Sequence, residues 1–230
     1  MKKIIIAVCA AMLSTSAAYA ADFTDIDGHW AQNTINSLAD AGYINGVGDG
    51  MFDPDGNVTR AQYLKMMMDT VGIEISDVRD GECLDASGDD WYAPYLQSAL
   101  DKGLIPRQMI TGYEVNVEPY TDENGNSAAK VTYLGAFSGN VAITREEAAF
   151  ISMGAYQYTL NANTMRKLAE PSDSNFTDKD SIDQWAYSAV KLAADNGIIT
   201  GMDDGRFAPL ENTTRAQAAV IMERLLNMIG

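Results

Sequence analysis

The sequence contains few of the side chains that bind metals or act as nucleophiles. It has two cysteines, Cys9 and Cys83, and one histidine, His29. A zinc cluster and a Cys–His pair both need more such residues than this. The acidic stretch 53–56 lacks the glycine spacing and the closing glutamate of an EF-hand loop. We therefore expect no metal, no cofactor and no catalytic residue, and we assign His29 a structural or solvent-facing role.

Positive charge and long apolar segments are also scarce. Sixteen lysines and arginines face 32 acidic residues, and the formal net charge is −16. A chain of this charge repels nucleic acid and anionic lipid. The apolar run at residues 4–13 is too short to cross a bilayer as a helix, and no later run is longer. The sequence therefore predicts no nucleic-acid partner and no membrane span.

The N-terminus has the form of a secretory signal peptide. Two lysines precede the short apolar run, and Ala18-Tyr19-Ala20 is a small-x-small cleavage site, so we assign residues 1–20 to the signal peptide. Loss of the two lysines takes the formal charge from −16 to −18. Cys9 is lost as well, so no intramolecular disulfide can form. The remaining Cys83 is expected to be a small buried residue.

Three copies of one unit fill most of the exported chain. Each copy has a tryptophan 12 residues before a glycine, namely Trp30 and Gly42, Trp91 and Gly103, and Trp185 and Gly197. A Thr-Arg pair follows. Its arginine lies 30 residues after the tryptophan in copies one and three and 54 in copy two, so copy two carries 24 additional residues. Such self-similarity is typical of repeats that bury their apolar faces on one another.

Each copy is predicted to form two helices joined by a loop. The first helix runs from the tryptophan to the glycine, which suits the left-handed position that ends a helix. The second helix begins at the Thr-Arg pair. There a threonine and a Gln or Glu three residues later form a capping box; the pairs are Thr59 with Gln62, Thr144 with Glu147 and Thr214 with Gln217. The Met-rich and aromatic stripes that follow are interpreted as core.

The additional residues of copy two, about 107–142, have a different pattern. Residues 114–118 and 130–134 alternate in polarity, and an Asn-Gly turn lies between them, which predicts a small β-hairpin. Four acids in this insertion leave open a small wall-active hydrolase: Glu114, Glu118, Asp122 and Glu123. We disfavour it, because carboxylates are common throughout this acidic chain and their presence says little about glycosidase activity.

Copies one and three share a series of short motifs that matches a known family pattern. Phe-Thr-Asp is followed by Trp-Ala, then by Gly-(Tyr/Ile)-Ile-(Asn/Thr)-Gly, Asp-Gly, Phe, Pro and Thr-Arg-Ala-Gln. This pattern resembles the surface-layer homology (SLH) domain, and copy two keeps both ends of it but not the middle. The resemblance implies a mainly α fold, with three helix-loop-helix repeats in a pseudo-threefold bundle. We place the repeats at 21–80, 81–160 and 161–230.

The resemblance also implies a function. SLH domains hold exported proteins non-covalently on the bacterial cell wall, usually through a secondary cell-wall polysaccharide whose terminal sugar carries a pyruvate ketal, and in some bacteria through modified peptidoglycan. We therefore expect a secreted, non-catalytic protein at the cell wall or cell surface. The alternatives are a structural envelope or surface-layer protein and a peptidoglycan-binding link protein, either with an envelope protein as partner.

In the family, the arginine of the Thr-Arg motif contacts the ligand in grooves between repeats, and here it corresponds to Arg60, Arg145 and Arg215. An arginine at the first turn of a helix can take a carboxylate in a bidentate fork, where the helix N-terminus also favours an anion. The motif's usual glutamate is glutamine at positions 62 and 217, which leaves the role of that carboxylate open. The disrupted loop of copy two leaves one groove in doubt.

Other side chains of the repeats complete the predicted ligand site. Stacking on a sugar ring is assigned to Trp30, Trp91 and Trp185, and contacts to hydroxyls are assigned to Asp25, Asp178 and the turns Asp49-Gly50 and Asp204-Gly205. Each assignment has a structural alternative. The arginines can pair with Asp25 or Asp178, the tryptophans can anchor the core, and the Asp-Gly pairs can be turns only.

Overall fold

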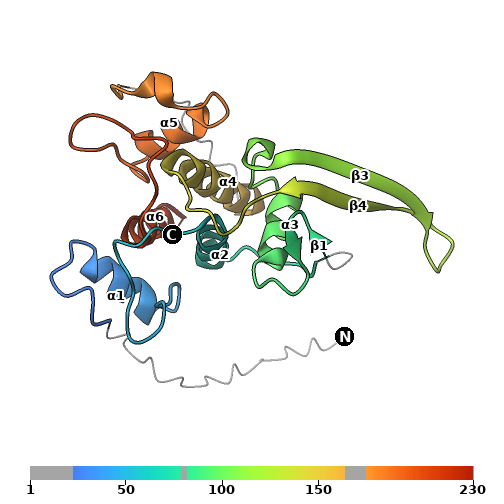
Figure 1. The fold of residues 1–230 in the computed structure, drawn as a ribbon, viewed down its shortest axis with the longest axis horizontal. Coiled ribbons are helices and arrows are strands. Elements are labelled where there is room, and N and C mark those ends of the chain that lie inside the picture. The colour runs from blue at the N-terminus through green and yellow to red at the C-terminus, as the bar shows by residue number, and fades with distance from the viewer. Residues whose placement is uncertain (1–22, 79–81, 164–174, 230) are drawn as a thin grey trace, which may run out of the picture.

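The computed structural model describes residues 23–78, 82–163 and 175–229. The expected signal peptide lies outside these residues. Within them, the three copies of the repeat each contribute one short and one longer α-helix, and copy two adds a long β-hairpin (Figure 1). No helix in the described part of the chain combines the length and apolarity needed to cross a membrane.

The first helix of each copy begins just after the tryptophan. These helices are α1 (Gln32–Asp40), α3 (Ala93–Asp101) and α5 (Tyr187–Asp195). The glycine two residues beyond each helix has a positive φ, between 69° and 79°, which confirms the predicted left-handed helix end. The residue after each tryptophan is buried, and these residues are Ala31, Tyr92 and Ala186.

The second helix of each copy begins at the arginine of the Thr-Arg motif. These helices are α2 (Arg60–Val71), α4 (Arg145–Asn163) and α6 (Arg215–Ile229). At α2 the Thr59 hydroxyl accepts the Gln62 N–H at 3.2 Å, and the Gln62 side chain accepts the Thr59 N–H at 3.0 Å. The same exchange occurs at the starts of α4 and α6. The three predicted capping boxes are confirmed.

The helices interlock across copies. The second helices α2, α4 and α6 contact one another, and each first helix packs on the second helix of a different copy: α1 on α6, α3 on α2 and α5 on α4 (Figure 1). Short antiparallel bridges join the segments that precede the second helices, pairing Asn57 with Thr214, Thr59 with Ala142 and Thr144 with Asn212. Since each copy covers the apolar face of another, the core is shared by all three.

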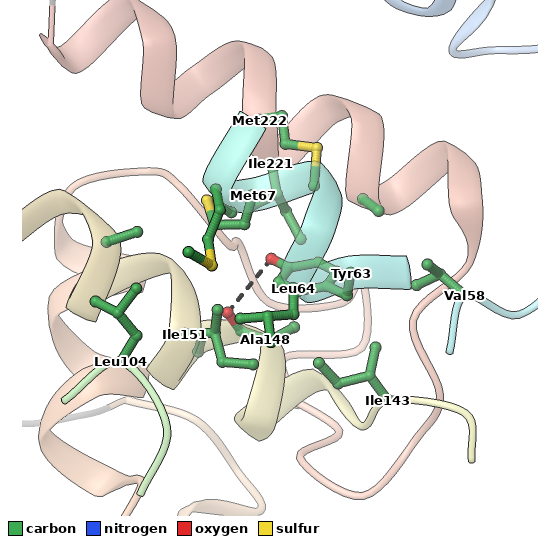
Figure 2. Close-up of a cluster of buried hydrophobic side chains, with 14 of the residues drawn as sticks. Val58, Tyr63, Leu64, Met67, Leu104, Ile143, Ala148, Ile151, Ile221 and Met222 are labelled. Atoms are coloured by element: carbon green, nitrogen blue, oxygen red, sulfur yellow. Dashed lines mark hydrogen bonds between the residues drawn. The ribbon is translucent and has the colours of Figure 1, made fainter. Parts of the chain in front are cut away.

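The centre of this shared core lies between α2, α4 and α6. Figure 2 shows Leu64 and Met67 of α2 close to Ile151 of α4 and Met222 of α6, and all four are buried. The hydroxyl of buried Tyr63 lies 2.7 Å from the Ser152 hydroxyl. Burial raises the pKa of Tyr63 well above its ordinary value. This hydrogen bond satisfies the one polar atom that Tyr63 brings into the core.

The insertion in copy two forms a long hairpin that leaves the helices. Strands β3 (Thr111–Thr121) and β4 (Ser127–Ala136) pair antiparallel from Thr111↔Ala136 to Thr121↔Ser127, with an irregularity near Gly112. The turn is closed by Asp122, whose carboxylate accepts the N–H groups of Asn124 and Asn126 at 2.9 and 2.8 Å. In Figure 1 the hairpin extends well past α3. The predicted hairpin is confirmed. Its strands, of 11 and 10 residues, make it much longer than the small hairpin that was expected.

The expected fold class is wrong. A mainly α, pseudo-threefold bundle was expected, but the described residues form a mixed α and β structure. Besides the 11- and 10-residue strands of the hairpin, a second two-stranded sheet pairs β1 (Glu82–Cys83) with β2 (Ala86–Ser87). Two 3₁₀ turns, η2 (Arg107–Met109) and η3 (Lys179–Ser181), complete the elements. The insertion, which only copy two has, supplies most of the strand residues of the described structure.

We expect the outer half of the hairpin to be dispensable for folding. Glu118 to Thr121 pair only with Ser127 to Lys130, and the described side chains there are mostly exposed. Replacing residues 118–130 by Asn-Gly, which favours a two-residue hairpin turn, should change the melting temperature by less than about 3 °C. Thermal unfolding followed by circular dichroism measures this. A large fall would show that the outer hairpin supports the helical body.

Candidate functional site

An aspartate at the start of each copy holds the loop that precedes the second helix. The Asp25 carboxylate accepts the backbone N–H groups of Phe52 and Asp53 at 2.8 and 2.7 Å. Burial pushes the pKa of Asp25 up, but these hydrogen bonds and the charge of Arg215 outweigh it, so the pKa lies below its usual value. Asp53 has a φ of +58°, so the carboxylate stabilises a turn that a non-glycine residue rarely adopts.

The other two copies repeat this arrangement. Asp178 accepts the N–H groups of Phe207 and Ala208, both at 2.8 Å, and Asp85 accepts those of Phe137 and Ser138 at 2.8 and 2.9 Å. Ala208 and Ser138 have φ of +59° and +56°. Each aspartate therefore fixes the position of one phenylalanine carbonyl: that of Phe52, Phe137 or Phe207.

The arginine of another copy binds each of these carbonyls. Arg215 donates from Nε to the Phe52 carbonyl at 2.7 Å and from Nη2 to the Asn45 carbonyl at 2.9 Å, and its guanidinium lies 4.6 Å from the centre of the Phe52 ring. Arg145 makes the matching bonds to the carbonyls of Phe207 and Thr200, both at 2.9 Å. The two guanidiniums are therefore held in the same way, each by a loop from another copy.

Neither of these arginines forms an ion pair with a described acidic residue. Arg145 is 5% exposed and Arg215 is 6% exposed, and burial lowers the pKa of both. Asp25 and Asp178 bind backbone N–H groups instead. The alternative in which these aspartates neutralise the arginines directly therefore does not hold at Arg145 and Arg215. Each retains a positive charge whose remaining N–H groups can meet an anion.

Each of the two arginines lines a cavity between copies. The cavity at Arg215 measures about 280 Å³ and is also lined by Gly46, Gln62, Lys65 and Trp91. The cavity at Arg145 measures about 180 Å³ and is also lined by Gly201, Gln217, Arg224 and Trp30. We call them the Arg215 cleft and the Arg145 cleft. Each takes residues from all three copies and falls below the roughly 300–1,000 Å³ of sites for drug-sized ligands. A single sugar unit is the scale of group that suits them.

Two of the tryptophans stand at these clefts and are largely exposed. Trp30 is 65% exposed in the Arg145 cleft, and Trp91 is 51% exposed in the Arg215 cleft. The interpretation of these two side chains as core anchors is wrong, because the residue after each of them takes the buried position. Large exposed aromatic rings at a cavity are suited to stacking on a flat apolar face, such as that of a sugar.

The predicted Asp-Gly turns do not join either cleft. The Gly50 carbonyl accepts the Thr24 N–H at 2.9 Å, and the Gly205 carbonyl accepts the Thr177 N–H at 3.0 Å. Asp49 has a φ of +50° and is exposed, and the Asp204 carboxylate pairs with Arg206 at 2.7 Å. Gly50 and Gly205 thus connect each loop to the start of its copy. Asp25 and Asp178 affect the clefts only by fixing the positions of the carbonyls that the arginines contact.

Arg60, the third predicted arginine, lies in a different environment. Its Nη1 donates to the Phe137 carbonyl at 3.0 Å, but its Nε and Nη2 donate to the carboxylate of Glu147. Trp185 is only half-buried and packs on Phe150, with ring centres 5.6 Å apart. The structure therefore brings Arg145 and Arg215 into two similar clefts, and it pairs Arg60 with an acid of its own chain.

Sequence reasoning missed several residues of this site. Lys65 and Arg224 add positive charge to the two clefts, and Asp85 holds the loop of copy two. Lys65 lies five residues after Arg60 and Arg224 nine after Arg215, at positions that differ between copies, so the repeat pattern did not single them out. Gly46 was visible in that pattern. A Cβ there would lie 2.4 Å from the Met51 carbonyl oxygen, so the cleft wall needs a glycine.

Comparison with known proteins supports the family assignment. The S-layer homology domain model matches residues 22–64 and 175–219, which lie in copies one and three. The chain thus belongs to the S-layer homology domain family, and the resemblance seen in its sequence is confirmed.

Similar proteins include enzymes and surface-layer proteins. Amylopullulanase of Thermoanaerobacterium thermosulfurigenes is 32% identical over 92% of this chain and 10% of its own length. Exoglucanase XynX of Acetivibrio thermocellus is 32% identical over 89% of the chain and 16% of its own length. The surface-layer 125 kDa protein of Lysinibacillus sphaericus is 27% identical over 93% of this chain and 15% of its own length. The chain therefore spans less than a fifth of these relatives.

The loop clamp gives a prediction about stability and pH. Asp25→Asn replaces one of the two acceptor oxygens by an NH₂ group, so the free energy of unfolding at pH 7 should fall by about 1–2 kcal/mol. Because the folded pKa of Asp25 is lowered from 3.8, its contribution is present above that pH and is lost as pH falls through the folded value. Urea unfolding at pH 7 and pH 3 should therefore show a smaller difference between wild type and variant at pH 3. Asp27→Asn, at an exposed neighbour, is the control, and an equal effect at both positions would contradict the clamp.

Proposed function

We propose that this chain binds an anionic polymer of the bacterial cell wall non-covalently, through the Arg145 and Arg215 clefts. The observation that carries the proposal is that each cleft combines an exposed tryptophan with a guanidinium that forms no ion pair with an acid in the described part of the chain. A carboxylate on a sugar fits this pair, because the fork-shaped guanidinium takes the carboxylate and the indole takes the ring face. We infer no catalytic role, and we place the protein at the cell surface after removal of residues 1–20.

The charge distribution supports an anionic ligand despite the acidic chain. Each cleft has a second basic residue, Lys65 at Arg215 and Arg224 at Arg145. Lys65 is paired with Asp69, which also lines the Arg215 cleft, whereas Arg224 donates to the Ile198 carbonyl at 3.3 Å. Local positive charge decides an anion's affinity at short range, since the field of distant charges is screened within about 8–10 Å at physiological salt.

We propose a secondary cell-wall polysaccharide with a pyruvate ketal as the specific ligand. The cleft volumes suit one terminal sugar, and the ketal places a carboxylate on that sugar's ring. Two clefts on one chain can engage two polymer ends on the same wall, and the second contact then benefits from a high effective concentration. Modified peptidoglycan is the competing ligand. A structural role in an envelope or surface layer is compatible with either ligand. That role concerns what the protein assembles into after it has bound to the wall.

We expect substitution of the exposed tryptophans to weaken binding without destabilising the fold. Trp30→Ala and Trp91→Ala should each weaken binding to purified wall sacculi about tenfold, since roughly 1.4 kcal/mol of ring contact is lost. The melting temperature should not fall, because both side chains are largely in solvent. Leu210→Ala removes an equally exposed apolar side chain outside both clefts and should leave sedimentation unchanged. Unaltered sedimentation of the double tryptophan variant would remove the clefts from the binding surface.

A second sedimentation experiment tests the identity of the polymer. Sacculi are compared before and after acid extraction of their non-peptidoglycan polymers. If the ligand is a secondary polysaccharide, extraction should abolish co-sedimentation of wild-type protein, because the carboxylated sugar is removed. Equal binding to both preparations would identify peptidoglycan as the target and would overturn the polysaccharide assignment.

A further inference from the structure

The Arg145 and Arg215 clefts are built from equivalent positions of the repeat. Nine residues of copy one line the Arg215 cleft, and the nine residues that lie 155 positions later, as Gly201 follows Gly46, line the Arg145 cleft. In both clefts the arginine comes from a second copy and the tryptophan from the third. Since the two frameworks match position by position, any difference in binding between them comes from the side chains that differ.

Among the described residues that line the clefts, two of the matched positions differ in charge. Lys65 of the Arg215 cleft corresponds to Val220 of the Arg145 cleft, and Asp69 corresponds to Arg224. The second difference reverses the sign of the charge at one point of the shared framework. The Arg215 cleft thus has two cations and one acid in its lining, whereas the described lining of the Arg145 cleft has two cations and no acid.

The second cation of the Arg215 cleft is held by the protein itself. The Lys65 ammonium pairs with the Asp69 carboxylate one helical turn later and lies 5.1 Å from the centre of the Tyr95 ring. Burial lowers the pKa of Lys65, but hydrogen bonds to Asp69 and Tyr95 outweigh it, so the pKa lies above its ordinary value. An anion in this cleft therefore meets the guanidinium of Arg215, a lysine that already has a partner, and a carboxylate.

The second cation of the Arg145 cleft is oriented but keeps its charge. The Nη1 of Arg224 donates to the Ile198 carbonyl at 3.3 Å, and Arg224 forms no ion pair with an acid in the described part of the chain. Backbone carbonyls hold Arg145 in the same way. Two charged guanidiniums thus line a cavity of about 180 Å³. One guanidinium can take one carboxylate in a fork, so two of them suit a group with two negative charges.

We propose that the two clefts differ in the anions they prefer. Both admit the single carboxylate of a pyruvate ketal, but the Arg145 cleft prefers a saccharide end that carries two negative charges, as a phosphate monoester does. Asp69 and Arg224 determine this difference, because they place opposite charges at the same point of the two clefts. The inference rests on the proposed function, since it assumes that both clefts bind acidic saccharides, and it assigns each cleft its own class of ligand.

The three tryptophans allow each cleft to be followed separately. Two probes are titrated into the full chain at pH 8 while the indole N–H signals are followed by NMR: a methyl glucoside with a pyruvate ketal and a methyl glucoside with a phosphate monoester, which carries close to two negative charges. Trp30 reports on the Arg145 cleft, Trp91 on the Arg215 cleft, and Trp185, which is in the lining of neither, is the internal reference.

In the wild type, both probes should bind more tightly at Trp30 than at Trp91. This preference should be at least about fivefold larger for the phosphate than for the ketal, because the energy of an anion beside an additional cation is proportional to the charge of the anion. The salt dependence of phosphate binding should also be steeper at Trp30, since more charge is neutralised there.

Exchange of the two differing positions should exchange the preference. Lys65→Val with Asp69→Arg gives the Arg215 cleft the charges of the Arg145 cleft and should raise the phosphate affinity at Trp91 to that at Trp30. Val220→Lys with Arg224→Asp should lower the phosphate affinity at Trp30 and leave Trp91 unaltered. Asp69→Asn, at a side chain that is 38% exposed, removes the acid with the least change of shape and should raise the phosphate affinity at Trp91.

Arg206→Gln is the matched control. It removes an arginine of copy three that is in the lining of neither cleft and should change neither titration. A preference for Trp30 that is equal for the two probes, or exchange variants that keep the wild-type preference, would overturn the inference and leave the proposed function standing. If neither probe shifts Trp30 or Trp91 in any variant, the proposed function is wrong and the inference fails with it.

Discussion

The fold and the proposed site depend on one interaction, the hydrogen bond from an arginine at the start of a long helix to a phenylalanine carbonyl in another copy. It occurs three times, as Arg60 to Phe137, Arg145 to Phe207 and Arg215 to Phe52. A buried guanidinium is costly unless its N–H groups are satisfied, so each contact favours the correct pairing of copies. Because copy one contacts copy two, copy two contacts copy three, and copy three returns to copy one, no copy completes its junction alone.

In each copy an aspartate fixes the position of the phenylalanine carbonyl that accepts this hydrogen bond. Asp25, Asp85 and Asp178 each hold two backbone N–H groups beside the phenylalanine carbonyl, in a loop where the next residue has a positive φ. Without this clamp the carbonyl would not be fixed, and a guanidinium held by a mobile acceptor would not present its free edge in one direction. The aspartate at the start of each copy therefore positions the loop and, through the loop, the arginine.

The sequence predicted the helices, caps and repeat order because these depend on local spacing. Gly42, Gly103 and Gly197 end their helices as expected, and the motif residues begin the second helices. It did not predict the mixed fold class, because the length of the hairpin is set by pairing between β3 and β4 rather than by the repeat. Nor could it decide whether Trp30 is an exposed ring or a core anchor, since Trp30 and Ala31 both fit an apolar stripe and only packing against another copy chooses between them.

The difference between the junctions lies on a level that neither motif nor fold reveals alone. Glutamate at position 147 conforms to the family pattern better than Gln62 or Gln217 does, but the copy-two loop that contacts Arg60 departs from that pattern. The contacts distinguish the junctions, because Nε and Nη2 of Arg60 donate to the Glu147 carboxylate, whereas the same atoms of Arg145 and Arg215 donate to backbone carbonyls. The anion binding proposed for the two clefts needs a cation that is both oriented and charged. The backbone carbonyls at Arg145 and Arg215 meet this requirement, since they fix the guanidinium and leave its charge in place.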